Sequence, residues 1–162
     1  MSLTPQDFRR AWSKFPTGVS LITTRTADGG PYCTTANAIS SVSLDPLLVH
    51  LSLATNGVTW ANVVRDGRFG LNVLGEDDEE LALFFSKATS EERQRVPAQH
   101  IVTEHGTVLL DEALTVMDCR VVQQVKAGDH TVFIAEVDRI DVREGRPLVF
   151  YDGRFTRVGE QG

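Results

Sequence analysis

Most of the chain shows a two-residue or continuous apolar pattern, and this pattern predicts β-strands. Between 113 and 142, apolar residues alternate on both sides of a turn at 126–129, so we expect a long β-hairpin whose second strand begins at His130. Further strands are predicted at 19–24, 31–35, 47–53, 69–73, 148–151 and 154–158. The run 47–53 is almost continuously apolar, which indicates a strand buried on both faces, with His50 as a packed, hydrogen-bonded core residue.

Short helices are predicted between these strands. Thr4 and Pro5 are typical of a helix start, and apolar residues on one face of the next segment predict a core-packing helix of about three turns that ends at Pro16. Further helices are expected at 58–65, after the acidic run 76–80, and at 89–96. We interpret the acidic run as a solvated helix start rather than a metal site, because acids oppose the positive end of the helix dipole.

These elements indicate a mainly β protein with a few short helices. About six to eight strands in one chain favour a closed antiparallel barrel with Greek-key connections. The segment 97–110 has no clear period, so we expect a long loop there, of the kind that acts as a lid or contacts a partner.

Composition restricts the class of protein further. A chain of 162 residues, 41% of them hydrophobic, is expected to form one domain over 1–162. The net charge of −6 disfavours a nucleic-acid partner, and we expect neither a membrane span nor a signal peptide, which favours the cytoplasm. Cys33 and Cys119 are far apart, so two buried, reduced thiols are expected rather than a disulfide or a zinc site.

The stretch from Cys33 to Ser43 consists almost entirely of small and polar residues and precedes Asp45-Pro46 and an apolar strand. We expect it to be a polar loop. Loops on a β scaffold that leave backbone N–H groups and hydroxyls free often bind ligands. A polar surface turn without a ligand is the alternative, and the stretch alone does not decide between the two.

Four motifs occur in the order that one known family shows. They are Phe15–Val19, Thr34–Val49, Gly128-Asp129-His130 and Pro147–Phe155. With them the chain resembles, roughly from Phe8 to Val158, the flavin reductase-like domain family, the short-chain reductases of two-component flavin monooxygenases. The resemblance implies a split β-barrel, usually a homodimer with flavin near the subunit interface. It also implies that NADH or NADPH reduces FMN or FAD for a separate oxygenase component.

The resemblance further implies which residues contact the flavin. Residues along its isoalloxazine ring and ribityl chain would be Thr35, Ala36 and Asn37, with donors from Ser41, Val42 and Ser43, and with Ser52, Leu53 and Ala54 on the next strand. Thr59 is a candidate phosphate ligand because helix N-termini bind anions. Ser86 and Lys87 are a second candidate for the phosphate, and a solvated helix end is the alternative for this pair.

For the nicotinamide side, the resemblance indicates His130, which would orient the dinucleotide or carry a proton near neutral pH. Tyr151 and Arg154 resemble C-terminal flavin or nicotinamide contacts, with an ordinary terminal hairpin as the alternative. The sequence has no Rossmann fingerprint and no nucleophile motif. Their absence agrees with hydride transfer between stacked cofactor rings, for which the protein supplies no nucleophile. Ala135 stands where many members have Gly, which leaves the flavin type open.

Two other functions are compatible with the same pattern. One is a flavin- or haem-binding protein of the same barrel that stores or senses its cofactor without turnover, and the other is a dimerisation module without a ligand. In a pure binder, replacement of His130 by Ala leaves cofactor affinity unchanged. A dimerisation module binds no flavin at all.

Overall fold

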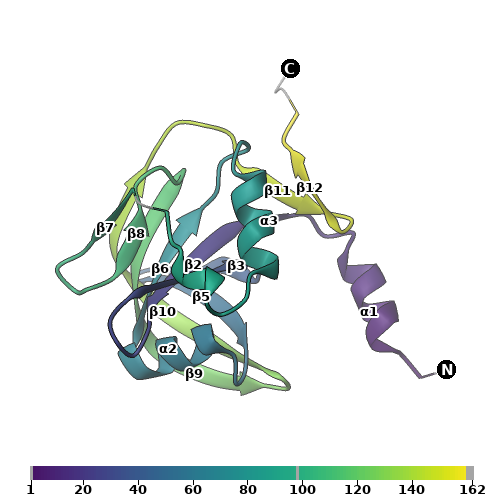
Figure 1. Ribbon diagram of the computed structural model, residues 1–162. Coiled ribbons are helices and arrows are strands. Elements are labelled where there is room, and N and C mark those ends of the chain that lie inside the picture. The colour runs from purple at the N-terminus through teal and green to yellow at the C-terminus, as the bar shows by residue number, and fades with distance from the viewer. Residues whose placement is uncertain (1, 98, 160–162) are drawn as a thin grey trace.

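A computed structural model describes residues 2–97 and 99–159 and shows a chain built mainly from strands (Figure 1). The helices are α1 (Pro5–Trp12), α2 (Val58–Asp66) and α3 (Glu79–Lys87), with a 3₁₀ helix, η1 (Glu92–Gln94). The strands are β1 (Thr17–Gly18), β2 (Ser20–Arg25), β3 (Pro31–Ala36), β4 (Ile39–Leu44), β5 (Leu47–Ala54), β6 (Arg68–Val73), β7 (His100–Val102), β8 (Val108–Leu110), β9 (Thr115–Ala127), β10 (His130–Val142), β11 (Leu148–Tyr151) and β12 (Arg154–Arg157). None of the helices in these described ranges has the length and apolar character needed to span a bilayer.

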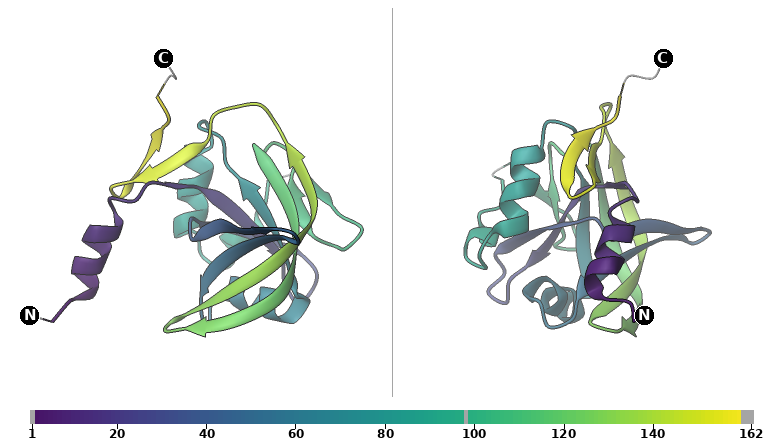
Figure 2. Two further views of the ribbon diagram at one scale, coloured as in Figure 1. Left: turned by 180° about the vertical axis from the view of Figure 1, so that it is seen from behind. Right: turned by 90° about the vertical axis from the view of Figure 1, so that its right-hand side faces the viewer.

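A seven-stranded antiparallel sheet forms the body of the protein, in the order β3-β2-β6-β9-β10-β5-β4. Two smaller sheets, β1-β11-β12 and β7-β8, accompany it. The large sheet is strongly twisted, so its strands cross at steep angles in Figure 2. The predicted hairpins β2–β3, β9–β10 and β11–β12 are confirmed, and His130 is the first residue of β10.

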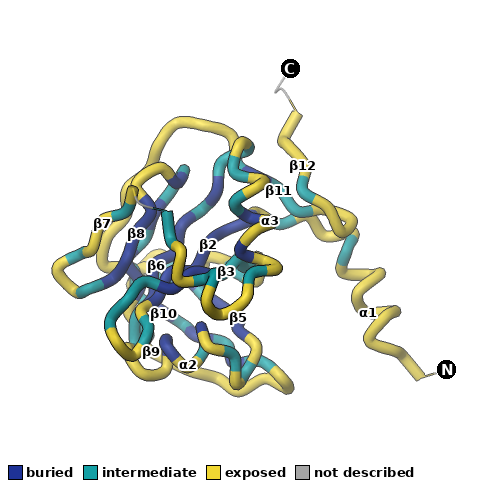
Figure 3. Tube along the Cα trace, viewed as in Figure 1, coloured by how far each residue is buried: buried dark blue, intermediate teal, exposed yellow. Residues whose placement is uncertain are grey.

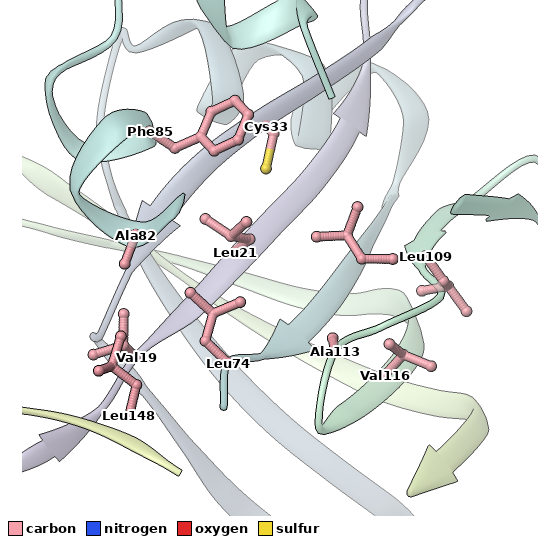
Figure 4. Packing of buried hydrophobic residues seen from close by; sticks show 11 residues of the cluster. Val19, Leu21, Cys33, Leu74, Ala82, Phe85, Leu109, Ala113, Val116 and Leu148 are labelled. Atoms are coloured by element: carbon pink, nitrogen blue, oxygen red, sulfur yellow. The ribbon is translucent and has the colours of Figure 1, made fainter. Parts of the chain in front are cut away.

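Two hydrophobic clusters fill the structure, one on each face of β2. Leu21 belongs to the first and Ile22 to the second, because successive side chains of a strand point to opposite faces. The first cluster, shown in Figure 4, contains Val19, Leu21, Cys33, Leu74, Ala82, Phe85, Leu109, Leu110, Ala113, Val116 and Leu148. The second contains Ile22, Val49, Leu51, Leu53, Val63, Phe69, Leu71, Cys119, Phe133 and Ala135. Helix α3 therefore covers the first cluster and α2 the second.

The segment 97–110 was expected to be a long loop, and this prediction was wrong: it forms the hairpin β7–β8. Strand β8 passes so close to β6 that a Cβ atom on Gly70 would collide with the Val108 carbonyl oxygen, so the crossing requires glycine. Asn72 fastens the crossing, since its Oδ1 accepts a hydrogen bond from the Leu110 backbone N–H at 2.7 Å. The close approach at Gly70 and the hydrogen bond of Asn72 both depend on contacts between segments that are distant in the sequence, so no local pattern reveals them.

Helix α1 begins as predicted but does not pack on the core. The Thr4 hydroxyl accepts a hydrogen bond from the Asp7 backbone N–H at 3.2 Å, and the Asp7 carboxylate accepts one from the Thr4 N–H at 2.9 Å. The helix has only eight residues, none of them buried, and Phe8 and Trp12 are 68% and 58% exposed. It stands apart from the sheet in Figures 1 and 3. An amphipathic pattern predicts an apolar face but not what covers it, so the expectation of core packing was wrong.

Strand β5 is buried on one face instead of two. Its residues alternate between buried Val49 and Leu51 and half-buried Leu48 and His50, because β5 lies between β10 and the edge strand β4 and only one of its faces meets the core. The Nδ1 atom of His50 is buried, and no hydrogen-bond partner for it exists among the described residues, so the hydrogen bond expected there is not formed at this nitrogen.

The polar stretch 33–43 was expected to be a loop, and this was also wrong. Strand β3 continues to Ala36 and β4 begins at Ile39, which leaves only Asn37 and Ala38 between the two strands. Thr34 and Thr35 lie in the predicted strand 31–35, so the error concerns the part after Thr35, where the β-branched Ile39 and Val42 favour extended backbone. The polar side chains of this segment are therefore held on strands.

Candidate functional site

The end of β3, the end of β5, the start of α2 and the start of β10 surround a cleft of about 510 Å³, which we call the main cleft. Of the residues predicted as cofactor contacts, Thr35, Ala36, Asn37, Ser52, Leu53, Ala54, Thr59 and His130 line it. These residues come from four separate parts of the sequence. The fold thus brings together most of the residues predicted for the flavin ring and for the nicotinamide.

Strand pairing explains this convergence. Strand β10 runs antiparallel to β5, and their register places His130 opposite Ala54. The Ser52 backbone N–H donates to the Ala38 carbonyl oxygen at 3.0 Å, which ties the end of β3 to β5. Because the register of a sheet is fixed along its length, His130 is held at the same end of the sheet as Asn37.

A second hollow of about 560 Å³, the adjoining cleft, shares Thr35, Ala36 and Asn37 with the main cleft. Its other walls include three predicted contacts, namely Ser86, Lys87 and Arg154. The Ser86 hydroxyl donates to the Leu83 carbonyl oxygen at 2.7 Å within α3. Neither Lys87 nor Arg154 forms an ion pair with any residue that the structure describes, so two cations remain available beside the shared wall.

The structure does not bring the remaining predicted residues into either cleft. Ser41 and Val42 are exposed on β4, and Ser43 is half-buried on the same strand. Tyr151, at the end of β11, is 39% exposed. Strand β4 is at the edge of the large sheet, and neither its three predicted residues nor Tyr151 line the two clefts.

The N-terminus of α2 provides a potential anion site in the main cleft. Its N-cap is Gly57, which has no side chain to bond the first-turn N–H groups, and Gly57, Val58 and Thr59 all line the cleft. Uncapped N–H groups and the helix dipole both favour a negative group at this position. The geometry therefore agrees with phosphate binding near Thr59.

His130 is joined to the residue before it. Its Nδ1 atom lies 2.8 Å from Oδ1 of Asp129, and this hydrogen bond, together with the charge of the imidazole, holds the pKa of the Asp129 carboxyl below its usual value. An ionised carboxylate only accepts, so Nδ1 carries the hydrogen and Nε2 is left with a free lone pair when the ring is neutral. The imidazole side chain is 45% exposed, so this nitrogen is accessible to a ligand.

Sequence reasoning missed the wall formed by residues 88–93. Arg93 donates from Nε to the Ala88 carbonyl oxygen at 3.0 Å and from Nη1 to the Thr34 hydroxyl, and the Tyr32 and Ser90 hydroxyls are 3.2 Å apart. These bonds hold the segment against β3, where Ala88, Ser90 and Arg93 line the main cleft. The predicted capping box from Thr89 was a signal of local order, but nothing in the sequence indicated that this segment folds over β3.

Trp60 was missed as well. It lines the main cleft and donates from Nε1 to the Thr131 hydroxyl at 2.9 Å. Its position directly after the candidate phosphate ligand Thr59 was the available signal.

Together, these features define a split β-barrel that carries two adjoining clefts. The sequence of residues 12–159 matches the family described as flavin reductase like domain. The chain belongs to this family, as its motifs predicted. The expected fold class, a mainly β split barrel with a few short helices, is confirmed.

Relatives and solved structures agree with this assignment. An NADH-dependent flavin reductase from Rhodococcus sp is 37% identical over 158 residues, which cover 96% of this chain and 88% of that protein. The NADH-dependent flavin reductase StyB from Pseudomonas fluorescens is 33% identical over 151 residues, 91% of this chain and 86% of that protein. The native-state structure of the flavin reductase PheA2 superposes with a TM-score of 0.87 at 33% identity, covering 98% of this chain and all of the other.

Proposed function

We propose that this protein is an oxidoreductase in which NADH reduces FMN or FAD. The observation that carries the proposal is the convergence of predicted flavin and nicotinamide contacts in one cleft of a chain that belongs to the flavin reductase family. The relatives that resemble it are named as NADH-dependent flavin or FMN reductases, which supports NADH as the hydride donor. The non-catalytic binder that the sequence left open has no observation in its favour.

The residues present fit a flavin. Small side chains, Thr35, Ala36 and Ala54, form part of the main cleft and leave room for a flat ring. The uncapped start of α2 at one side, and Lys87 and Arg154 at the other, offer two places for phosphate. A bound flavin and dinucleotide supply the hydride chemistry themselves, so the role of the chain is to hold the two rings at stacking distance.

In this assignment His130 would hold the nicotinamide side of the main cleft. Asp129 accepts the hydrogen on Nδ1, so Nε2 would be free to accept a hydrogen bond from the carboxamide N–H of a dinucleotide. Such a contact would orient the nicotinamide ring. Orientation of this kind is the main contribution that a protein makes when both reactants are cofactors.

We also propose a homodimer with the flavin near the subunit interface. A single chain leaves Leu44 86%, Val142 71% and Phe8 68% exposed, which is unusual for large apolar side chains. A second copy that covers β4 would also bring a ligand or a partner chain to the polar groups of Ser41, Val42 and Ser43. These groups do not line the clefts of their own chain. The measurement is sedimentation velocity, for which we expect a species of twice the chain mass.

Several relatives are named as reductase components of monooxygenases, among them a 4-nitrophenol monooxygenase reductase component from Rhodococcus opacus. We propose that this chain likewise supplies reduced flavin to a separate oxygenase. We also propose a cytoplasmic location, which the two free, buried cysteines Cys33 and Cys119 support. The whole chain, 1–162, would act as one domain.

The deciding experiment is anaerobic. The protein is mixed with FMN or FAD and then with NADH or NADPH, and the visible flavin absorbance is followed against a control without protein. We expect rapid bleaching with NADH. A band that persists with both nucleotides while flavin co-elutes with the protein would favour the non-catalytic binder, and a failure to bind flavin would leave only the dimerisation module.

A further inference from the structure

Thr131 follows His130 in β10 and is almost completely buried, at 6% exposure. It does not line the main cleft, so it does not touch a ligand there. Its hydroxyl accepts a hydrogen bond from the Trp60 indole Nε1 at 2.9 Å and lies 3.1 Å from the Thr55 hydroxyl. One buried oxygen thus connects β10, the start of α2 and the residue that follows β5.

The same place holds the turn that carries His130. The Thr55 backbone N–H donates to the Asp129 carbonyl oxygen at 2.9 Å. Thr55 therefore bonds to residues on both sides of His130, through its backbone to Asp129 and through its hydroxyl to Thr131. Together with the Trp60 bond, these contacts fix the beginning of β10 to the floor of the main cleft.

Backbone pairing with β5 and β9 holds this end of the β9–β10 hairpin from His130 onward. The residues from Gln123 to Asp129 are all exposed, so the tip of the hairpin has few packing contacts that would fix its position. A segment with few buried contacts and exposed hydrogen bonds is expected to move unless it is anchored. Among the described residues, the three bonds around Thr131 and Thr55 add anchors next to His130 to this backbone pairing.

We propose that Thr131 is a positioning residue for His130. Its hydroxyl, held by Trp60 and Thr55, fixes the direction from which the His130–Asp129 pair meets the nicotinamide. The inference rests on the proposed function, because it assigns a nicotinamide contact to His130. Displacement of a positioned group by about 1 Å is enough to lower a rate by as much as about 100-fold, so loss of the anchor has a measurable cost.

The test is a double-mutant cycle with Thr131→Val, His130→Ala and the combination. We expect Thr131→Val to lower kcat/KM for NADH by about 5- to 20-fold. Flavin affinity, measured by equilibrium dialysis, should stay within about twofold. In the His130→Ala background, the same change should cost less than about twofold, because the group that it positions is absent. Equal losses in both backgrounds would mean that Thr131 acts only on the general structure and would overturn the proposal.

Two variants control for folding. Thr131→Ser keeps the hydroxyl and should retain kcat/KM for NADH within about twofold, whereas Thr55→Val removes one partner of Thr131 and leaves the Trp60 bond in place. If Thr131→Val does not fold, Thr55→Val takes its place in the cycle, with an expected loss of about threefold that is again absent without His130. A Thr131→Ser variant as impaired as Thr131→Val would also contradict the proposal, because the hydroxyl would then not be the active feature.

A readout without turnover separates this inference from the proposed function. The imidazole nitrogens of His130 are observed by ¹H–¹⁵N NMR in the ligand-free protein and assigned with His130→Ala. Wild type should carry its hydrogen on Nδ1, and Thr131→Val should move part of the population to the other tautomer. An unchanged spectrum overturns the inference even if the protein reduces flavin. A protein that reduces no flavin but shows the shift retains the positioning role and loses only the proposed reaction.

Discussion

The structure uses the same kinds of polar side chain in two opposite ways. In one network, which consists of Arg68, Thr103, Thr107, Asp118 and Asp138, every member bonds to another, and Thr107 and Asp118 are buried. The Asp118 carboxylate, 1% exposed, accepts from Thr107 at 2.6 Å, from Arg68 at 2.9 Å and from Thr103 at 3.0 Å, and Arg68 also reaches Asp138 at 2.6 Å. Such a closed set fastens the β7–β8 hairpin to the large sheet.

In the two clefts, polar groups are left open instead. Lys87 and Arg154 form no ion pair within the described ranges, His130 bonds through Nδ1 alone, and α2 begins without a side-chain cap. Leaving charged groups without partners brings no stability, so their grouping around one pair of hollows is better explained by a ligand. The difference distinguishes a network that stabilises the fold from the site that we propose for the cofactors.

The largest effect is expected where the closed network is broken. Asp118→Ala removes a buried carboxylate and leaves Arg68 and two hydroxyls with fewer partners, so the free energy of unfolding should fall by about 3 kcal/mol. Urea denaturation measures the change. Asp111→Ala is the matched control, since Asp111 pairs with Arg143 on the surface and should cost less than about 1 kcal/mol. Equal losses of unfolding free energy in the two variants would mean that the Asp118 network stabilises the fold no more than an exposed ion pair does.

The next effect concerns an open group in the main cleft. His130→Ala should lower kcat/KM for NADH by about 100-fold, because the nicotinamide loses its orienting contact, while the free energy of unfolding changes by less than about 1 kcal/mol. Steady-state kinetics and urea denaturation of the same preparation give both values. His105→Ala, which removes an exposed histidine outside the two clefts, should change neither. A large fall in the free energy of unfolding without a change in kcat/KM would mean that His130 stabilises the fold and does not contact the nicotinamide.

A smaller effect is expected for the open cations. Lys87→Ala and Arg154→Ala should each weaken flavin binding about tenfold, because a charge-assisted bond to phosphate is lost. Flavin affinity should be measured by fluorescence titration at low and high salt, and the salt dependence should be weaker in the variants. Arg143→Ala, which removes an exposed cation that pairs with Asp111, is the control. Unaltered affinity in both cleft variants would remove Lys87 and Arg154 from the site.

The smallest effect concerns the two cysteines, which we expect not to react with thiol reagents in the folded protein. Burial raises the pKa of the Cys119 thiol to about 12 and raises that of Cys33 as well, so little thiolate exists at pH 8. A disulfide reagent such as DTNB should label neither cysteine in the folded protein and both in urea. Because the raised pKa favours the neutral thiol, labelling of the folded protein should increase only at strongly alkaline pH. Fast labelling of the folded protein at pH 8 would show that at least one of the two cysteines is accessible to solvent.

Much of the fold could be predicted from local pattern. Alternation around the turn at 126–129 predicted the β9–β10 hairpin, and the glycine-containing turn at Asp152-Gly153 predicted β11–β12. There both residues adopt positive φ, 51° and 78°, as a tight hairpin turn of this type requires. These elements depend on neighbours in sequence, which is why the pattern was sufficient.

The failures share a physical cause. The apolar face of α1 was assigned to the core, although a pattern does not say which surface will cover it. The hairpin at 100–110 and the wall made by Arg93 depend on contacts with β6 and β3, far away in the chain. For the site, the motif resemblance identified residues that do meet in the clefts, and Ser41, Val42, Ser43 and Tyr151, which do not line them. The cofactor roles of all these residues remain predictions.

Strand β2 gives the molecule a further property. Leu21 and Ile22 are both completely buried, one in each hydrophobic cluster, so a single strand serves as a wall of both. Neither half of the interior can melt while the other stays intact, because separating β2 from one cluster also disturbs its backbone bonds to β3 and β6. Heating should therefore produce one calorimetric transition whose van't Hoff and calorimetric enthalpies agree. We therefore expect the barrel to unfold as a single cooperative unit, although its interior is divided into two clusters.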